Sequence, residues 1–351
     1  MNDQAINDYI STTNSLLDAQ GKAIDILIRQ SENNQKLLEH LDNGITALNN
    51  LPVIRIQALQ KIDNERLNYE MELPLSSIKE RSAERRDVSH SITVSLTSFP
   101  RRMHELKYTL FSLARQTLQP DRIVLWLSHE EFPQHEDDIA LSLLTLIRRW
   151  KIDIRWVSNL RSYKKIIPAL QEYPDDIIVT ADDDIYYHEE WLAELYEEYL
   201  QHGNIVAHRV QRVLFDGDGS LQPSNAWPYA EDGSLSYLNI ATGVGGVLYF
   251  PGCFHSDVTD VEKFLRLCPT ADDLWLWAME ILAGQMIRKT AAPRRELVCV
   301  NPLREFSPDP KEHLMAENMF YGGNDRQLHQ LMREYPRLMT ILSEHDGKDQ
   351  K

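Results

Sequence analysis

The sequence predicts an α/β domain with a mixed, mainly parallel sheet flanked by helices, preceded by an N-terminal α-helical coiled coil. Two patterns predict this fold class. From residue 91 onward, short runs rich in β-branched residues alternate with amphipathic segments, which favours parallel strands connected by helices. Before that, the first 50 residues carry an apolar repeat of 3.5 residues, which is typical of a coiled-coil seam.

The N-terminal segment 1–51 is expected to be an oligomerisation helix. With Ile10 as the first a position, eight of the twelve a and d positions up to Leu48 are apolar. Pro52 then ends the helix because it lacks an N–H donor and clashes with the preceding turn. A single amphipathic helix lying on the chain's own domain would give the same pattern. Self-association into a homo-oligomer through residues 1–50 is the favoured interpretation.

The segment 52–90 is expected to be a helical linker, and 336–351 a C-terminal tail. Between them lies the α/β domain, residues 91–335, whose elements alternate from its start. Strands are expected at 92–97, 122–128, 153–158 and 176–180, and helices at 103–117, 136–150 and 162–173. Ligands of such sheets bind beyond the carboxyl ends of the strands. The residues that directly follow the strands are therefore candidates for a functional site.

The composition narrows the class of protein. The net charge of −16 argues against sequence-independent binding of nucleic acid, which needs a basic face. Three cysteines without a CxxC pair give no zinc framework and fit a reducing compartment. No apolar run approaches the ~18 residues of a membrane span, and the N-terminus lacks the features of a signal peptide. A cytoplasmic protein is expected.

Three consecutive aspartates, Asp182, Asp183 and Asp184, follow the fourth expected strand. Three adjacent carboxylates repel one another, and raised pKa values or a bound cation relieve this repulsion. Hard divalent cations prefer carboxylate oxygens. Alternate residues of an extended segment point the same way. Asp182 and Asp184 are thus expected to face one site, while Asp183 points elsewhere. The alternative is an acidic turn that caps the following helix.

Five segments carry a resemblance to a known family. They are TSFPRR (97–102), RSYKKIIPAL (161–170), TADDD (180–184), TGVGGVLYFPG (242–252) and TADDLWLWAMEILAG (270–284). In their order and spacing they resemble glycosyltransferases of the GT-A fold, most closely the bacterial family-2-like enzymes that build capsule or lipopolysaccharide glycans. The resemblance covers roughly residues 91–330, and TADDD looks like the DxD motif of that family.

The resemblance implies a metal-dependent transfer of a sugar, in which a hexose is expected, from a nucleotide-sugar donor, with UDP-sugars favoured. The acceptor would be a glycan, possibly lipid-linked, so peripheral association with the inner face of the cytoplasmic membrane is expected. Asp182 and Asp184 would hold Mn²⁺ or Mg²⁺, which neutralises the leaving diphosphate. The implied donor-binding residues are Thr97, Pro100, Arg101, Lys165 (with Lys164 as the alternative), Asp183, Gly245 and Gly246.

Asp273 is implied as the general base of an inverting transfer, which removes a proton from the acceptor hydroxyl. The family usually has Glu-Asp where this chain has Asp-Asp, so the choice between Asp272 and Asp273 stays open. A plain helix cap at Thr270 or Asp272 is the structural alternative. His255 and His313 are available as a third metal ligand, but no motif surrounds either, and the ligand is left unassigned.

Two other functions stay open. Nucleotidyl transfer to a sugar phosphate also uses carboxylates and Mg²⁺ on an α/β sheet. It usually places a glycine- and basic-rich phosphate loop after the first strand, and TSFPRRMHE contains no glycine. The other possibility is a non-catalytic coiled-coil assembly protein with a degenerate sugar-nucleotide domain. The presence of Asp182, Asp184 and Asp273 counts against this non-catalytic function.

Overall fold

The computed structural model describes residues 90–292, 297–301, 318 and 322–346. The chain divides into two compact units, 1–61 and 62–351, and all described residues belong to the second. The expected coiled coil of residues 1–51 and the linker 52–90, apart from its last residue, lie outside the described residues. Both stay predictions.

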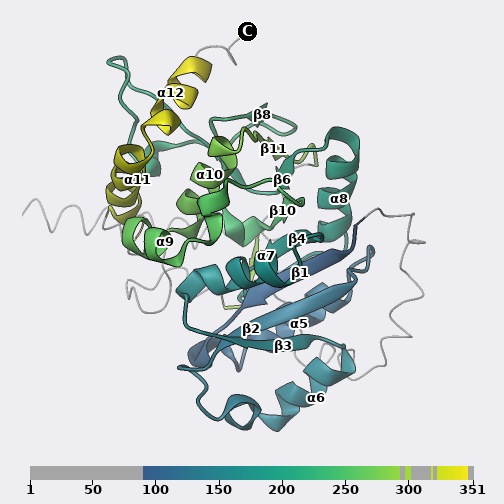
Figure 1. The fold of residues 1–351 in the computed structure, drawn as a ribbon. Coiled ribbons are helices and arrows are strands. Elements are labelled where there is room, and N and C mark those ends of the chain that lie inside the picture. The colour runs from purple at the N-terminus through teal and green to yellow at the C-terminus, as the bar shows by residue number, and fades with distance from the viewer. Residues whose placement is uncertain (1–89, 293–296, 302–317, 319–321, 347–351) are drawn as a thin grey trace, which may run out of the picture. The chain divides into compact units, whose positions relative to one another are not determined.

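A mixed sheet forms the centre of the described domain (Figure 1). Its eight strands run in the order β3-β2-β1-β4-β10-β6-β11-β8. The strands β1 to β4 are mutually parallel where they pair, and β10 lies antiparallel between β4 and β6. The bounds are β1 (Ile92–Thr97), β2 (Arg122–Ser128), β3 (Asp153–Val157), β4 (Ile177–Ala181), β6 (Ile205–Ala207), β8 (Leu235–Ser236), β10 (Val247–Tyr249) and β11 (Ile287–Lys289).

The predicted alternation of strands and helices is confirmed from β1 to β4. The connecting helices are α5 (Leu106–Ala114), α6 (Leu141–Arg149) and α7 (Ile167–Glu172). Each is shorter than expected. The 3₁₀ turns η3 (His135–Asp138) and η4 (Arg161–Lys165) take up the first part of the expected ranges 136–150 and 162–173, whereas η2 (Pro100–Arg102) lies before the expected range 103–117. Periodicity alone does not locate the residue at which such a turn gives way to the helix that follows.

Helices cover both faces of the sheet. On β2, Ile123, Leu125 and Leu127 belong to one apolar cluster, whereas Val124 and Trp126 belong to the other. This is the two-residue period of a strand buried on both sides. The first cluster includes side chains of α5, α6 and α8 (Trp191–His202), and the second those of α7, α9 (Val261–Leu267) and α10 (Asp272–Leu282). The predicted α/β fold class is confirmed.

The remaining elements extend the described domain beyond its expected end. Helices α11 (Gly323–Glu334) and α12 (Pro336–His345) follow one another, and Leu338 and Leu342 of α12 are fully buried. Residues 336–345, expected as part of a tail, therefore form a packed helix. Two small sheets pair β5 (Ile185–Tyr186) with β12 (Val298–Cys299) and β7 (Val210–Arg212) with β9 (Asn239–Ala241).

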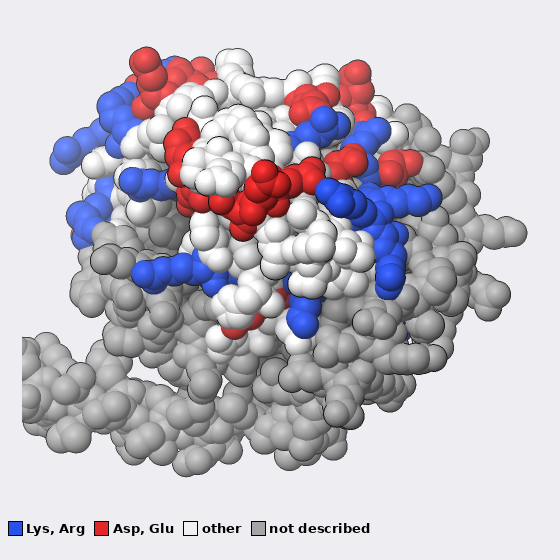
Figure 2. Space-filling view, turned by 90° about the horizontal axis from the view of Figure 1, so that it is seen from below, with Lys and Arg blue, Asp and Glu red and all other residues white. Residues whose placement is uncertain are grey.

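The surface of the described domain mixes both charges. Seen from below, one face carries a band of acidic side chains with basic side chains on either side of it (Figure 2). Within the described ranges, no helix combines the length and the hydropathy that crossing a bilayer requires.

Candidate active site

The three aspartates lie at the carboxyl edge of the parallel strands. Strand β4 ends at Ala181, beside Leu96 of β1, so Asp182 directly follows β4 and Ser98 follows the end of β1 at the same edge. The backbone N–H of Asp182 donates to the Tyr187 hydroxyl at 2.8 Å, and that hydroxyl donates to the carbonyl of Val244. These two bonds hold the aspartate turn against the glycine-rich segment before β10.

Asp183 points into the protein. It is buried, whereas Asp182 and Asp184 are half-buried, which is the alternation expected of an extended segment. The Asp183 carboxylate accepts hydrogen bonds of 2.5 Å from Ser98 Oγ and from Arg102 Nη1. Its two oxygens thus serve to hold the turn. Its expected contact with a donor stays a prediction.

Arg102 is a site residue that the sequence did not reveal. Its Nη1 also lies 2.7 Å from Asp184 Oδ2, whereas Arg101, the expected residue, is exposed. Burial by itself would lower the pKa of Arg102, but the charges of Asp183 and Asp184 outweigh burial and raise it. The 3₁₀ turn η2 decides which of the two arginines faces the aspartates, and no local sequence signal distinguishes them.

Lys165 connects the aspartate turn with the second acidic pair. Its Nζ lies 2.7 Å from Asp182 Oδ1 and 3.3 Å from Asp272 Oδ2, and its side chain is 8% exposed. Burial would lower the pKa of Lys165, but the nearby carboxylates raise it well above its usual value, so the ammonium stays charged. Its neighbour Lys164 pairs instead with Glu131 at 2.5 Å. The structure therefore places Lys165, not Lys164, at the aspartates.

Asp273 lies in the first turn of α10, where its Oδ1 accepts a hydrogen bond of 3.0 Å from the backbone N–H of Gly243. Burial, together with the negative charge of Asp272, raises the pKa of Asp273 to about 7. A Cβ on Gly243 would lie 2.9 Å from Asp273 Oδ1 and 3.0 Å from Lys165 Nζ. The approach of these side chains thus depends on glycine at this position.

Helix capping does not explain either acidic group. The N-cap of α10 is Ala271, without a side-chain cap, and Asp272 contacts Lys165 instead. The N-cap of α8 is Glu190, again without a side-chain cap, so the three aspartates do not cap that helix. Both structural alternatives considered for these carboxylates are therefore wrong.

Protein side chains occupy the space beside the other two expected glycines, Gly245 and Gly246. A Cβ on Gly245 would lie 2.7 Å from Cβ of Arg209, and one on Gly246 would lie 2.4 Å from the indole of Trp191. Gly246 also has a φ of +92°, which disfavours any other residue. The indole N–H of Trp191 donates to the carbonyl of Gly245 at 2.8 Å. Contact of these glycines with a donor stays a prediction.

The remaining expected residues lie near the site's edge or elsewhere. The Thr97 hydroxyl donates to the carbonyl of Trp126 at 2.8 Å, and Pro100 is exposed. Their role in donor binding stays a prediction. His255 is the N-cap of a short turn, where its Nδ1 accepts from the N–H of Asp257. His313 lies outside the described residues.

Comparisons with known proteins leave the activity open. No model of a known protein family matches the chain, and no curated protein matches it. Two solved structures are similar in part: 4-diphosphocytidyl-2C-methyl-D-erythritol synthase from Anaerococcus prevotii (14% identity, TM-score 0.37, 66% of this chain and 99% of that one) and a cytidylyltransferase from Leptospira borgpetersenii (12%, 0.36, 72% and 97%). TM-scores this low do not establish a shared function.

Proposed function

We propose that this chain is a metal-dependent glycosyltransferase, which moves a sugar from a nucleotide-sugar donor to a hydroxyl group of a glycan acceptor. One observation carries the proposal. The pair Asp272 and Asp273 meets the three-aspartate turn across the buried ammonium of Lys165, at the carboxyl edge of the parallel strands. This is where ligands of such sheets bind.

The aspartate turn fits a hard divalent cation. Asp182 and Asp184 are half-buried and offer only oxygen, which suits Mg²⁺ or Mn²⁺. Five carboxylates, those of residues 182–184, 272 and 273, meet two cations, Arg102 and Lys165. The excess of acidic groups favours a further positive charge. When bound, the metal ion supplies neutralising charge for the diphosphate that leaves.

Asp273 fits the part of general base. The proton of a sugar hydroxyl must be removed as the hydroxyl attacks, and a base whose pKa lies near the working pH does this best. The pKa of Asp273, raised by burial and by Asp272 to about 7, meets that condition. The charge of Lys165 stabilises the ionised neighbours, so the acidic groups can stay close together.

Nucleotidyl transfer to a sugar phosphate is the second candidate. The buried ammonium of Lys165 beside Asp182 favours it, because a lysine at this place suits a phosphoryl group. Cytidylyl transfer, named for one of the solved structures above, belongs to this class of reaction. An attacking phosphate is already anionic at neutral pH and needs no base. The acidic pair therefore favours the hydroxyl acceptor.

The identity of the product tests the proposal. The full-length chain is incubated with Mn²⁺ and a panel of nucleotide sugars, and separately with nucleoside triphosphates plus sugar phosphates. Release of a nucleoside diphosphate from one sugar donor, lost in Asp184→Ala together with metal-dependent donor binding, is the expected result. Release of pyrophosphate in the second set alone establishes the nucleotidyl-transfer alternative. Failure of every nucleotide to bind leaves the non-catalytic assembly function.

A further inference from the structure

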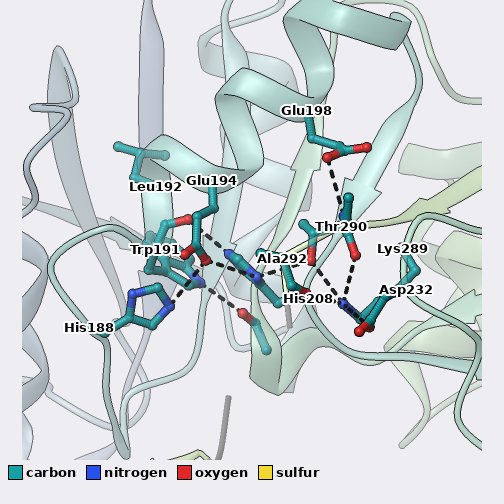
Figure 3. Close-up of polar contacts among 12 residues, drawn as sticks. His188, Trp191, Leu192, Glu194, Glu198, His208, Asp232, Lys289, Thr290 and Ala292 are labelled. Carbon is teal, nitrogen blue, oxygen red and sulfur yellow. Dashed lines mark hydrogen bonds and ion pairs between the residues drawn. The ribbon is translucent and has the colours of Figure 1, made fainter. Parts of the chain in front are cut away.

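A second group of ligand-type side chains lies outside the aspartate site. His188 stands between β5 and α8, Glu194 is in the first turn of α8, and His208 directly follows β6 (Figure 3). Each offers one ligand atom, and these atoms all lie within 4.8 Å of one another. The three side chains point toward a common centre, although they come from three different segments (Figure 3).

The spacing suits a shared metal ion. Glu194 Oε2 lies 3.5 Å from His188 Nε2 and 3.7 Å from His208 Nδ1. Tetrahedral zinc binds nitrogen and oxygen at about 2.0–2.2 Å, which separates neighbouring ligand atoms by roughly 3.4 Å. Small side-chain rotations would therefore bring all three atoms to one ion.

The tautomer of His208 points to the same conclusion. Its Nε2 lies 2.9 Å from the carbonyl oxygen of Trp191, which can only accept, so Nε2 carries the proton. In a neutral ring, Nδ1 then presents a lone pair toward the Glu194 carboxylate. Two lone pairs that face each other repel unless a cation or a proton lies between them. The Thr290 hydroxyl also lies near this atom, 3.4 Å from Nδ1.

Known metal sites share this hydrogen bond. A histidine ligand usually donates its other ring N–H to a carboxylate or a backbone carbonyl, which fixes the tautomer and the orientation of the ring. The bond from His208 to the carbonyl of Trp191 has this form. The ring is thus oriented by α8, the helix that also carries Glu194.

We propose that His188, Glu194 and His208 bind a divalent transition-metal ion, with Zn²⁺ as the best fit. Two imidazoles and one carboxylate are a donor set that zinc accepts, and three protein ligands leave a fourth position for water. The side chains of the three residues are 28%, 18% and 16% exposed, so an ion can enter from solvent. The aspartate turn offers only oxygen, which sets the two sites apart chemically.

A bound ion would join three segments of the carboxyl edge. The loop before α8, the helix itself and the segment after β6 would share one ion, and the indole of Trp191 on that helix packs against Gly246. Zinc would therefore stabilise the α8 side of the proposed active site without taking part in its chemistry. The inference stands on these three residues and does not depend on the proposed function.

A metal titration of the full-length chain tests the proposal. The protein is stripped with a chelator and titrated with Zn²⁺ against a zinc-sensitive dye, in excess Mg²⁺ that occupies oxygen-only sites. Binding of one equivalent is expected, and Glu194→Gln, which removes a ligand charge at almost constant shape, should weaken it by more than ~100-fold. Glu197→Gln, an exposed site on the same helix, should bind zinc like the wild type.

Cobalt absorption, the melting temperature and the zinc affinity together decide whether the metal site exists. Co²⁺ in place of Zn²⁺ should give visible absorption of a four-coordinate site in the wild type and lose it in His208→Gln. If either variant fails to fold by circular dichroism, the wild type alone decides, because bound zinc must raise its melting temperature. No zinc-dependent rise in melting temperature, or equal zinc affinity in folded Glu194→Gln, overturns the proposal. The cluster is then a histidine–carboxylate ion-pair network.

Discussion

Lys165 is the residue on which the candidate active site is centred. Its ammonium is buried between Asp182 and Asp272, which lie far apart in the sequence. Taking a charge out of water is costly unless the charge is paired. The ammonium of Lys165 and the two carboxylates therefore stabilise one another in the buried site. Substitutions at the neighbours of Lys165 should therefore change the chemistry of the site.

Asp273→Asn should lower kcat by ~10²–10⁴-fold and leave donor binding intact, because the amide keeps the shape but cannot take a proton. In the wild type, kcat should fall as pH drops below about 7, since burial and Asp272 raise the pKa of Asp273 to that value and only the ionised form accepts a proton. Steady-state kinetics between pH 5.5 and 9 measures both. A variant that retains wild-type kcat and pH profile excludes Asp273 as the base.

Gly243→Ala should reduce kcat with little loss of stability. The added Cβ would meet Asp273 Oδ1 and Lys165 Nζ, which are the ends of side chains and can move away. A displacement of a catalytic group by about 1 Å can lower the rate by about 10²-fold. The matched control is Gly217→Ala, where a Cβ meets nothing within 4 Å. Equal kinetics and equal melting curves for both variants would show that the approach at Gly243 is unimportant.

Helix α10 carries two carboxyl groups with raised pKa values, Asp273 and Glu280. Asp272 and Asp273 are in its first turn, where the helix dipole favours negative charge. Two turns further on, Glu280 is 1% exposed within the apolar cluster. Burial, with a smaller contribution from Asp273, raises the pKa of Glu280 to about 8. This carboxyl is therefore mainly protonated at neutral pH.

Glu280→Gln should become more stable relative to the wild type as pH rises from 5 to 8. Folded Glu280 keeps its proton up to about pH 8, whereas the unfolded chain loses it near pH 4.5. The wild type therefore loses stability through this window, by about 1.4 kcal/mol per unit of pKa difference. Glutamine has no such proton.

Urea unfolding of both proteins at several pH values measures the effect. The exposed Glu262→Gln on α9 controls for the substitution itself. A stability difference between Glu280→Gln and wild type that is constant from pH 5 to 8 would contradict the raised pKa.

At the scale of the whole molecule, an acidic α/β domain follows a segment with a coiled-coil pattern. The net charge of −16 favours solubility. For the proposed glycosyltransferase, linked copies of the enzyme would raise its local concentration on a polymeric acceptor. Self-association through residues 1–50 is therefore the whole-molecule prediction.

Leu27→Asp, at a d position of the predicted seam, should reduce the molecular mass in sedimentation equilibrium toward that of a single chain. A charge in a seam is unfavourable because it is removed from water without a partner. Asn33→Asp, at a position outside the seam, introduces the same side chain and should leave the mass unchanged. Equal masses for wild type and Leu27→Asp would favour the alternative of a helix lying on its own domain.

The sequence by itself determined the parallel strands, the helices between them and the position of Asp182 and Asp184 directly after β4. These follow from periodicity and from strand order, which are encoded by neighbouring residues. Lys164 and Lys165 stayed alternatives until the structure placed Lys165 beside Asp182 and Lys164 beside Glu131. Strand bounds at β1 and β2 agree with the structure because their apolar runs end abruptly at polar residues.

Only the tertiary structure decided which side chains meet. It selected Arg102 over Arg101, paired Lys165 with Asp272, and filled the open sides of Gly245 and Gly246 with Arg209 and Trp191. It also gathered His188, Glu194 and His208, which share no motif. Such contacts depend on which side chain of a short turn faces the site, and on how strands from distant segments lie side by side. Neither property is written in a local pattern of residues.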